Sequence, residues 1–531
     1  MHDDQTTTDL ERIDIDALAS TLPAVLIQAA GRYKQKPFVV TPSRTLSYGQ
    51  TLEMSQRLAH RLCEAGLKPG ERVALLLPND WPFIIAIFAV MMSRGIVVPL
   101  DPRIRPATFG QIRRDCGIRA LIGERAALDR LRSMLDDSGD PIVICCADHT
   151  GTARQSFRHA VYSLESIVSR NVQPLSSLPI ETNSDTVVSI NYTSGSTGMP
   201  KGVMHSHRSW LASAAFTASY FGLRAGDSMV IPLPLRHAYG FRHLLAYMMS
   251  GARVFLSNGL LEALQPTQDT RPNALLLVPD TCRILVKDFK DQLRNLGPWL
   301  KFVSVGTGTI SSEPIQRLRD ILENVQLHIP YGLTEARVGF LRVDDDPSRR
   351  RLCAIAPGLQ VRVVDGNGRA VECGQTGEIV IRGEGLMLGY WNSSEQERRE
   401  LVHFGFRTGD RGLVTDKGEI ALLGRIDEMI KVAGRKVHPA EVENVLNKHP
   451  AVAESAVMAI SDPSGIAEVR LEATAVLHKD AAASEAALIQ HCKAHLEAYK
   501  VPTAIVFAAA LPRTSTGKIM RNRNEPLSVQ D

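Results

Sequence analysis

One short stretch of small polar residues combines the side chains that a phosphate group needs. It reads Tyr192-Thr-Ser-Gly-Ser-Thr-Gly-Met-Pro-Lys-Gly202. Its glycines let the backbone turn tightly around an anion and point N–H groups inward. Its hydroxyls add donors, and Lys201 adds a positive charge. It is not a Walker loop, because Gly198 is followed by Met-Pro and not by Lys-Ser or Lys-Thr. The alternative is a flexible turn that binds no ligand, and other stretches of the sequence are needed to distinguish the two interpretations.

The elements around this loop indicate an α/β fold. An apolar, β-branched run at 186–190 predicts a strand before the loop, and 205–215 predicts the start of a helix after it. A buried helix is predicted at 81–92 and another helix at 243–249. Further apolar strands are predicted at 72–77, 96–100, 120–122, 141–145, 229–233, 253–256, 274–278 and 302–305. Strands that alternate with helices predict mixed or parallel sheets covered by helices on both faces.

The character of the chain changes in its last third. Residues 359–364 and 377–382 alternate apolar and polar positions, which predicts an antiparallel, barrel-like sheet. From about residue 425 a helix opening at Pro439, two strands and a last helix predict a small α+β domain. We therefore expect a large N-terminal domain at 1–425, with a barrel-like subdomain at about 355–425, and a small C-terminal α+β domain at 426–531.

Bulk composition excludes several classes of protein. The chain has 531 residues, 44% hydrophobic and 22% charged, which is typical of a globular protein. Its net charge of +4 does not support nucleic-acid binding. Eight cysteines without a C-x-x-C pair favour a reduced, cytoplasmic setting over a zinc site or a disulfide framework. The start lacks the pattern of a signal peptide, and the longest apolar run is too short to span a membrane.

Four more stretches combine glycines with polar or charged residues that could bind a ligand or take part in a reaction, as the loop does. They are Tyr331-Gly-Leu-Thr-Glu335, Phe406-Arg-Thr-Gly-Asp410, the segment 424–437 and the segment 513–521 with Lys518. Together and in this order, the five stretches resemble the acyl-adenylate-forming (AMP-binding) superfamily. That superfamily includes acyl-CoA synthetases, adenylation enzymes and luciferases. The resemblance runs from about residue 47 to residue 521, which is nearly the whole chain.

The resemblance implies a ligase reaction. A carboxylate attacks the α-phosphorus of ATP and gives acyl-AMP and pyrophosphate, so phosphate charge must be neutralised and the oxygens aligned. Thr334 would donate to the α-phosphate, and Glu335 would bind Mg²⁺, which prefers oxygen ligands. The implied ATP- and AMP-binding residues are Thr193, Ser194, Gly195, Ser196, Thr197, Gly198, Lys201, Gly306, Thr307, Gly308, Tyr331, Gly332, Asp410 and Arg425.

Within that set the resemblance assigns separate roles. Asp410 would accept hydrogen bonds from both ribose hydroxyls, and Arg425 would contact the ribose side. The segment 306–308 and Tyr331 would frame the adenine and the acyl group. Lys518 would bridge the substrate carboxylate and the α-phosphate and stabilise charge in the transition state. The alternative for Lys518 is a solvated lysine in a frayed tail.

A second set concerns the acceptor. Asp427 matches the hinge about which the C-terminal domain is expected to swing between an adenylating and a thioester-forming pose; the alternative is a surface aspartate. In the second pose Gly434, Arg435 and Lys436 would face the acyl-adenylate. Ala433 stands where glycine is common in the family, which bears on the shape of the thiol channel.

A third set borders the expected acyl pocket, in the stretch 232–242. His237 would be catalytic, and Tyr239, Gly240 and Arg242 would line the pocket; an ordinary core histidine is the alternative for His237. Arg236 stands where the family often has an aromatic residue. If Arg236 or Arg242 points inward, it would pair with a polar or anionic group on the acid. Otherwise the arginines point outward or pair with the protein's own groups.

Three functions remain open from the sequence. The first is an acid–thiol ligase that uses coenzyme A, or the pantetheine of a carrier protein acting in trans. The second is an adenylate-forming enzyme whose acceptor is an amine, which gives an amide as in coronafacate-ligase-like members. The third is a non-catalytic nucleotide-binding relative, which Lys518, Glu335 and Asp410 argue against. The sequence does not identify the carboxylic acid.

Overall fold

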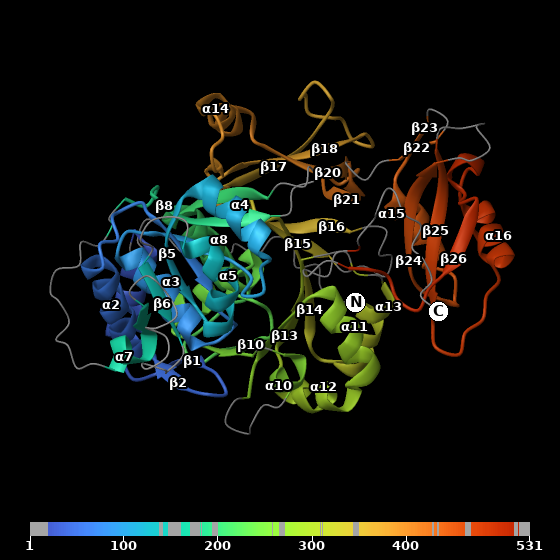
Figure 1. The fold of residues 1–531 in the computed structure, drawn as a ribbon. Coiled ribbons are helices and arrows are strands. Elements are labelled where there is room, and N and C mark those ends of the chain that lie inside the picture. The colour runs from blue at the N-terminus through green and yellow to red at the C-terminus, as the bar shows by residue number, and fades with distance from the viewer. Residues whose placement is uncertain are drawn as a thin grey trace.

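The fold was analysed in a computed structural model (Figure 1). It describes residues 20–136, 142–146, 161–169, 181, 183–193, 200–257, 259–264, 271–307, 310, 312–342, 350–426, 430–432, 435–461, 469–513 and 519. Two large sheets with helices between and outside them make up most of the chain, and a smaller unit follows. The α/β fold expected from the sequence is confirmed.

The smaller of the two large sheets has eight strands in the order β19-β9-β8-β4-β3-β5-β6-β7. Its strands β3 to β8 pair in parallel, whereas β9 runs antiparallel to β8 and to β19. The bounds are β3 Arg72–Leu76, β4 Ile96–Pro99, β5 Ile118–Gly123, β6 Ile142–Cys145, β7 Val161–Ser163, β8 Val187–Thr193, β9 Lys201–Ser206 and β19 Gly389–Tyr390.

The larger sheet has thirteen strands in the order β17-β18-β20-β21-β16-β15-β14-β13-β12-β10-β11-β1-β2. Its central strands β10 to β14 are parallel, and the strands from β15 to β21 are antiparallel. The bounds are β1 Pro37–Val40, β2 Thr45–Ser47, β10 Ser228–Ile231, β11 Arg253–Leu256, β12 Ala274–Leu277, β13 Phe302–Val305, β14 Gln326–Gly332, β15 Arg337–Arg342, β16 Arg351–Ile355, β17 Leu359–Val364, β18 Thr376–Gly383, β20 Phe406–Val414 and β21 Ile420–Arg425.

A single hydrophobic core joins the facing sides of the two sheets through five helices. They are α1 Leu22–Tyr33, α2 Tyr48–Glu64, α3 Trp81–Met92, α8 His207–Tyr220 and α9 Ala238–Met249. Of these, α3 is buried on nearly every side, as its unbroken apolar sequence predicts. This central layer matters for function because α8 and α9 pack on each other beside the strands that carry the polar stretches.

Other helices cover the outer faces. Helices α4 and α5 cover the outer face of the smaller sheet, and α11, α12 and α13 cover that of the larger one. The bounds of these and the remaining helices are α4 Pro106–Cys116, α5 Arg125–Asp136, α7 Leu164–Ser169, α10 Leu260–Ala263, α11 Pro279–Asp288, α12 Lys290–Leu296, α13 Ser312–Ile321 and α14 Glu395–Phe404, with a 3₁₀ turn at Gly297–Trp299. No described helix is long and apolar enough to cross a membrane.

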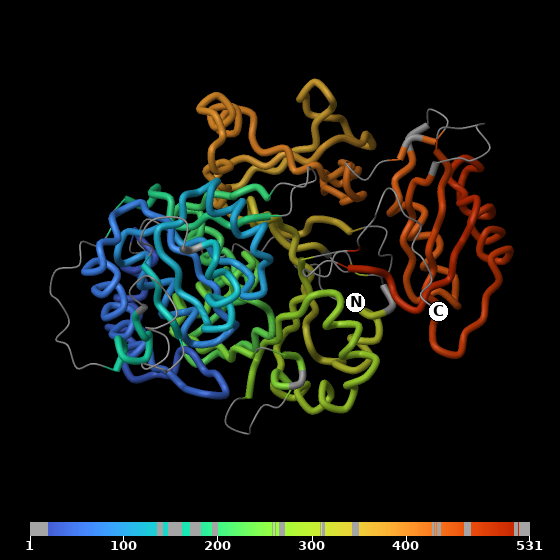
Figure 2. The backbone as a smooth tube through the Cα atoms, in the orientation of Figure 1, coloured from blue at the N-terminus to red at the C-terminus, as the bar shows by residue number. Residues whose placement is uncertain are grey.

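The last part of the chain builds its own core beside the large sheets (Figure 2). Helices α15 Pro439–Leu446 and α16 Glu485–His495 pack on the three-stranded sheet of β24 Val452–Ser461, β25 Val469–Leu477 and β26 Ala504–Phe507. A separate hairpin pairs β22 Ile430–Val432 with β23 Arg435–Val437, and a 3₁₀ turn spans Ala498–Lys500. The domain boundary near residue 425 stays a prediction, because residues 427–429 are outside the described ranges.

Candidate active site

The phosphate-loop sequence joins two antiparallel strands. Strands β8 and β9 pair in register from Val187–Ser206 up to Thr193–Lys201, so Thr193 and Lys201 lie opposite each other at one end of the paired strands. The predicted passage from loop directly into helix is therefore wrong. Lys201–Ser206 forms a strand because its apolar residues are buried between β8 and β19. Helix α8 starts only at His207, where the Ser206 hydroxyl accepts from the backbone N–H of Ser209 and caps it.

Strand β19 brings Tyr390 beside the hairpin and links it to Glu335. The Tyr390 hydroxyl donates to Glu335 Oε1 at 2.9 Å. The Lys201 ammonium lies 5.4 Å from the centroid of the Tyr390 ring, which is within the range of a cation–π contact. Glu335 and Lys201, far apart in sequence, are thus connected through one tyrosine. Oε1 is occupied, and no described residue donates to the second carboxylate oxygen of Glu335.

Two buried side chains fix the backbone turn that precedes Glu335. His205 Nε2 donates to the Thr334 carbonyl at 2.8 Å, and Arg242 donates to the carbonyls of Leu333 and Thr334 at 3.0 and 3.3 Å. Burial lowers the pKa of His205 to about 3, with the charge of Arg242 acting in the same direction. His205 is therefore a neutral donor at physiological pH. The two side chains hold Thr334 and Glu335 in a defined orientation.

Asp410 lies where strands β14, β20 and β21 approach one another. The Tyr331 hydroxyl donates to Asp410 Oδ2 at 2.7 Å, and the Arg425 guanidinium donates to Oδ1 at 3.2 Å. Arg425 also donates to the Thr408 carbonyl at 2.7 Å. Burial raises the pKa of Tyr331, and the neighbouring Asp410 charge raises it further, so the phenol stays a hydrogen-bond donor. Three residues that the sequence assigned to the nucleotide are in direct contact.

The segment after β13 completes the same edge of the larger sheet. A Cβ on Gly306 would lie 2.6 Å from the Tyr239 ring and 2.7 Å from Pro330, so the close approach of these rings requires glycine. The next residue, Thr307, has a φ of 75°, and its buried hydroxyl has no hydrogen-bond partner. Strands β13 and β14 are parallel, so Gly306 and Tyr331 meet at their carboxyl ends, where α/β proteins place ligands.

The residues expected to border the acyl pocket lie around the start of α9. His237 precedes the helix, and its buried Nε2 has no hydrogen-bond partner. Burial lowers its pKa to about 4, and the Arg236 charge acts in the same direction, so the imidazole is neutral. The Tyr239 hydroxyl bonds to the Ser304 hydroxyl at 2.9 Å, and Gly240 is buried beside it.

The two arginines of this stretch pair with the protein's own groups. Arg236 forms an ion pair with Asp101 at 2.9 Å, and its side chain is 12% exposed. Arg242 donates to the two backbone carbonyls described above and is 4% exposed. These contacts correspond to internal pairing, one of the two alternatives that the sequence left open. For Arg242 the structure therefore supports a positioning role for the turn before Glu335.

Several predicted site residues are outside the described ranges, and the structure does not place them. They are Ser194, Gly195, Ser196, Thr197, Gly198, Gly308, Asp427, Gly434 and Lys518. The backbone of Arg435 and Lys436 is described in β23, but their side chains are not. In Figure 1 the hairpin β22–β23 lies well apart from α11.

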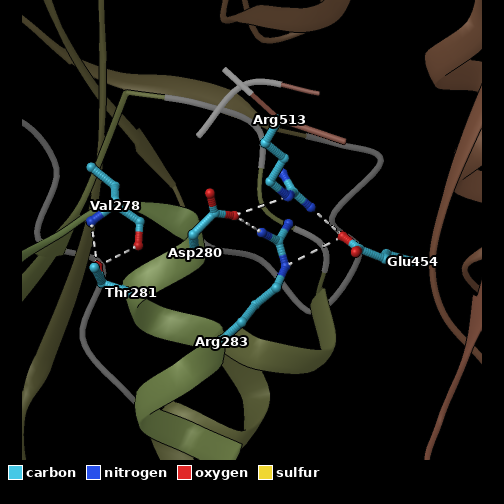
Figure 3. A network of polar contacts seen from close by, with 6 residues as sticks. All are labelled: Val278, Asp280, Thr281, Arg283, Glu454 and Arg513. Atoms are coloured by element: carbon cyan, nitrogen blue, oxygen red, sulfur yellow. Dashed lines mark hydrogen bonds and ion pairs between the residues drawn. The ribbon is translucent and has the colours of Figure 1, made fainter. Parts of the chain in front are cut away.

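A network of charges links the C-terminal unit to α11 (Figure 3). Arg513 pairs with Asp280 of α11 at 3.2 Å, and Arg283 of α11 contacts Glu454 of β24 at 3.7 Å. Arg513 also pairs with Glu454, and Arg283 with Asp280 at 2.7 Å. Helix α11 follows β12, which adjoins β13 and its Gly306. Arg513, five residues before Lys518 in the sequence, is therefore held at the helix that follows β12.

An isolated β-bridge joins two residues that lie on either side of Lys518 in the sequence. Arg513 and Ile519 form an antiparallel bridge, so both ends of the stretch that contains Lys518 lie together. Among the described residues no cluster of three or more His, Cys, Asp or Glu side chains could hold a metal ion. Glu335 is thus a single carboxylate, and Mg²⁺ in nucleotide sites is commonly held by one or two carboxylates together with substrate phosphates.

Comparison with known proteins assigns the class. Residues 26–391 match the model of the AMP-binding enzyme family, and residues 441–518 match that of the AMP-binding enzyme C-terminal domain. The chain therefore belongs to the AMP-binding enzyme family, as the resemblance of its motifs predicted.

Three relatives illustrate the range of that family. A long-chain-fatty-acid–CoA ligase of Escherichia coli O157:H7 is 28% identical, over 93% of this chain and 92% of its own. The anthranilate CoA ligase AuaEII, solved with anthranoyl-AMP, is 25% identical with a TM-score of 0.82, over 96% of this chain and 97% of its own. The amide bond synthetase McbA from Marinactinospora thermotolerans shares the fold, at 23% identity and a TM-score of 0.81 over 94% and 98%.

Sequence reasoning missed the residues that hold the site together. Tyr390 and His205 lie outside the recognised motifs, and only the pairing of β9 with β19 and with β8 brings them to the Thr334–Glu335 turn. A buried histidine beside a polar loop was a usable signal, because such a group must find a hydrogen-bond partner.

Proposed function

We propose that the protein is an ATP-dependent carboxylic acid ligase that makes an acyl-AMP and then transfers the acyl group to a thiol. The observation that carries the proposal is that the described nucleotide residues form two connected groups around the end of β14, with contributions from both large sheets. Glu335 is linked to Lys201 through Tyr390, and Asp410 to Tyr331 and Arg425. The CoA ligases among the relatives support the thiol as the acceptor.

In the first step a carboxylate oxygen of the acid bonds to the α-phosphorus of ATP and pyrophosphate leaves. The Gly- and Ser/Thr-rich sequence from Thr193 to Lys201 would supply backbone and side-chain donors to the phosphates, with the positive charge of Lys201. The Asp410 carboxylate is oriented by Tyr331 and Arg425 and accepts from the ribose hydroxyls. Lys518, on the segment docked by Arg513, donates to the carboxylate and the α-phosphate as charge develops.

Magnesium fits the free oxygen of Glu335 together with the phosphates of ATP, and when bound it would neutralise phosphate charge. Thr334, whose backbone carbonyl is held by His205 and Arg242, would donate its hydroxyl to the α-phosphate.

In the second step the acceptor attacks the acyl carbonyl carbon and AMP leaves. Coenzyme A is the first candidate, and a carrier-protein pantetheine supplies the same thiol chemistry. Rotation about Asp427 would bring Gly434, Arg435 and Lys436 to the acyl-adenylate, and the present distance of β22–β23 from α11 in Figure 1 suits an adenylating pose. A cytoplasmic location follows if the acceptor is coenzyme A.

An amine acceptor is the second candidate, and the likeness of fold to an amide bond synthetase is what favours it. The test is AMP release from ATP and an acid identified by pyrophosphate exchange, with coenzyme A, a phosphopantetheinylated carrier or an amino acid added in turn. We expect coenzyme A or the carrier to accelerate AMP release. Acceleration by the amino acid alone would contradict the thiol assignment.

The Lys518→Ala variant separates the two steps. It should lower pyrophosphate exchange by about 100- to 1000-fold, which is typical for the loss of one placed electrostatic donor. Transfer from pre-made acyl-AMP to the thiol should persist. An equal fall in both steps would show that Lys518 does not act in adenylation.

A further inference from the structure

One buried arginine beside the site has no counter-ion in the part of the chain that the structure describes. Arg337 opens strand β15 and is 2% exposed. Its Nε and Nη2 are buried without a hydrogen-bond partner, and no ion pair of Arg337 with a described residue is found. A buried guanidinium is normally paired, because removing an unpaired charge from water is strongly unfavourable.

Among the described residues, the surroundings of Arg337 offer polar groups but no compensating negative charge. The titratable groups that interact favourably with it are the phenols of Tyr239 and Tyr220, from α9 and α8, and both are neutral at physiological pH. Burial lowers the pKa of Arg337 to about 10. Its guanidinium carbon lies 4.4 Å from the Phe340 ring centroid, and this cation–π contact replaces only part of the lost hydration.

A second buried cation lies nearby. Burial lowers the pKa of Arg242 to about 9, and repulsion by Arg337 lowers it further. Glu335 is the acidic group that offsets the charge of Arg242, and it is also the carboxylate proposed to face Mg²⁺. Two guanidinium groups against one carboxylate leave this region with an excess of positive charge.

Arg337 is next to the reacting part of the site. It follows Glu335 by two residues and pairs with Gly332 across the β14–β15 turn. A Cβ on Gly332 would lie 3.6 Å from Arg337 Cδ, so the side chain runs alongside that turn. Tyr239, whose charge acts on Arg337, packs on Gly306. The guanidinium therefore lies between α8, α9 and the ends of β13 and β14.

His243 of α9 has another buried polar atom without a hydrogen-bond partner in the same region. Its Nδ1 bonds to the Tyr239 carbonyl at 2.9 Å, so Nδ1 is the donor and Nε2 is an acceptor. This Nε2 is buried and has no partner. Unpartnered polar atoms on both Arg337 and His243 indicate that a polar group from outside the chain completes the site.

Aromatic side chains close the space beyond Arg337. The Tyr220 and Phe340 rings stack at 3.7 Å, and the Phe221 and Phe302 rings at 3.9 Å. His328 packs edge-on against all four of these rings, and its Nδ1 bonds to the Tyr220 hydroxyl at 3.1 Å. Phe340 is fully buried, so a long alkyl chain would have to displace these packed rings to extend in this direction.

From these contacts we infer that Arg337 binds a second carboxylate on the acid substrate, so that the enzyme activates short dicarboxylic acids at the carboxylate away from Arg337. This inference rests on the ligase function proposed above. The bound carboxylate would supply the charge that the buried guanidinium lacks, and the aromatic wall would limit the length of the acid.

The test is ATP–pyrophosphate exchange with three matched acids of one chain length: the dicarboxylic acid, its monoamide and the alkanoic acid. We expect kcat/KM for the dicarboxylic acid to exceed that for the other two by about 100-fold or more, because truncating one partner of a buried charge pair typically costs that much. Arg337→Met should remove this preference, and Arg337→Lys should keep part of it. Arg294→Met, on the exposed helix α12, serves as the control and should leave the preference intact.

A second readout separates a binding arginine from a structural one. Replacing an unpaired buried charge by methionine should raise the unfolding temperature of the unliganded protein, and the dicarboxylic acid should stabilise wild type but not Arg337→Met. A wild-type preference for the alkanoic acid, or a preference for the dicarboxylic acid that Arg337→Met leaves intact, would overturn the inference and leave the ligase function standing. Failure of every acid to support exchange would overturn the ligase function, and the inference with it.

Discussion

The hydroxyl of Tyr390 donates a hydrogen bond to Oε1 of Glu335 at 2.9 Å, and the same ring lies under the ammonium of Lys201. These residues come from β19, the turn after β14 and β9, and thus from both large sheets. The tyrosine therefore couples the hairpin proposed to hold the phosphates to the carboxylate proposed to hold the metal.

Removing only the hydroxyl tests this coupling. We expect Tyr390→Phe to raise the Mg²⁺ concentration for half-maximal adenylation by about 10- to 100-fold, as for other residues that orient a metal ligand. The ring contact with Lys201 is kept, so the KM for the acid should change little. Adenylation is measured as a function of Mg²⁺ at saturating ATP. An unchanged Mg²⁺ dependence would remove Tyr390 from the site.

Asp410 provides a test of the nucleotide site. In Asp410→Asn the charge that Tyr331 and Arg425 stabilise is lost, at a cost of about 1.5–3 kcal/mol for a hydrogen bond to a charged group. The KM for ATP should therefore rise by roughly 10- to 100-fold. Glu419→Gln breaks the pair with Arg351 elsewhere in the large sheet and is the matched control. Equal effects of the two variants would mean that Asp410 acts only on stability.

The charges between α11 and the C-terminal unit predict a dependence on salt. Asp280→Asn and Glu454→Gln weaken the docking of Arg513, and partly exposed pairs are each worth about 0.2–1 kcal/mol. We expect each variant to slow adenylation by about two- to fivefold at low salt. Transfer from pre-made acyl-AMP should not slow.

The salt dependence of wild type and of the variants tests whether the ion pairs hold the adenylating pose. Wild type should lose adenylation rate as salt increases, because exposed charges are screened, and the variants should lose less. Asp291→Asn, which breaks a pair within α12, is the control. Identical salt curves for wild type and variants would show that the network does not hold the adenylating pose.

Buried histidines predict a loss of stability in mild acid. Burial lowers the pKa of His207 to about 4, and its Nδ1 accepts from the backbone N–H of Leu22 at 3.2 Å. A lowered histidine pKa means that the unfolded chain takes up the proton first. The contribution of neutral His207 to the free energy of unfolding is therefore complete above about pH 6.5. It falls by roughly 1.4 kcal/mol per pH unit between that pH and the pKa of His207 in the folded protein.

The His207→Asn variant keeps an acceptor for Leu22 but does not titrate. Urea unfolding at several pH values between about 7 and 5 should give it a shallower loss of stability than wild type. His403→Asn, at an exposed position in α14, should follow the wild-type curve. A variant curve parallel to wild type would show that His207 does not titrate on unfolding.

The sequence alone predicted the elements well where apolar periodicity is strong. The strands β3, β4 and β10 to β13 and the helices α3 and α15 lie where the pattern predicts them. The prediction failed at Lys201–Ser206. The local sequence pattern of a short strand that pairs on both sides does not distinguish it from the start of a helix. Tyr390 and Arg337 were missed for a related reason: their roles depend on sheet pairing and burial, which link residues far apart in sequence.

The central claim is that an oxygen of the acid becomes bonded to the α-phosphorus of ATP. The direct measurement uses an acid found by pyrophosphate exchange, labelled with ¹⁸O in its carboxyl groups, together with ATP and coenzyme A. The account predicts AMP that carries one ¹⁸O atom, because the acceptor attacks the acyl carbon and the labelled oxygen leaves with AMP. Unlabelled AMP, or ADP with the label in inorganic phosphate, would contradict it.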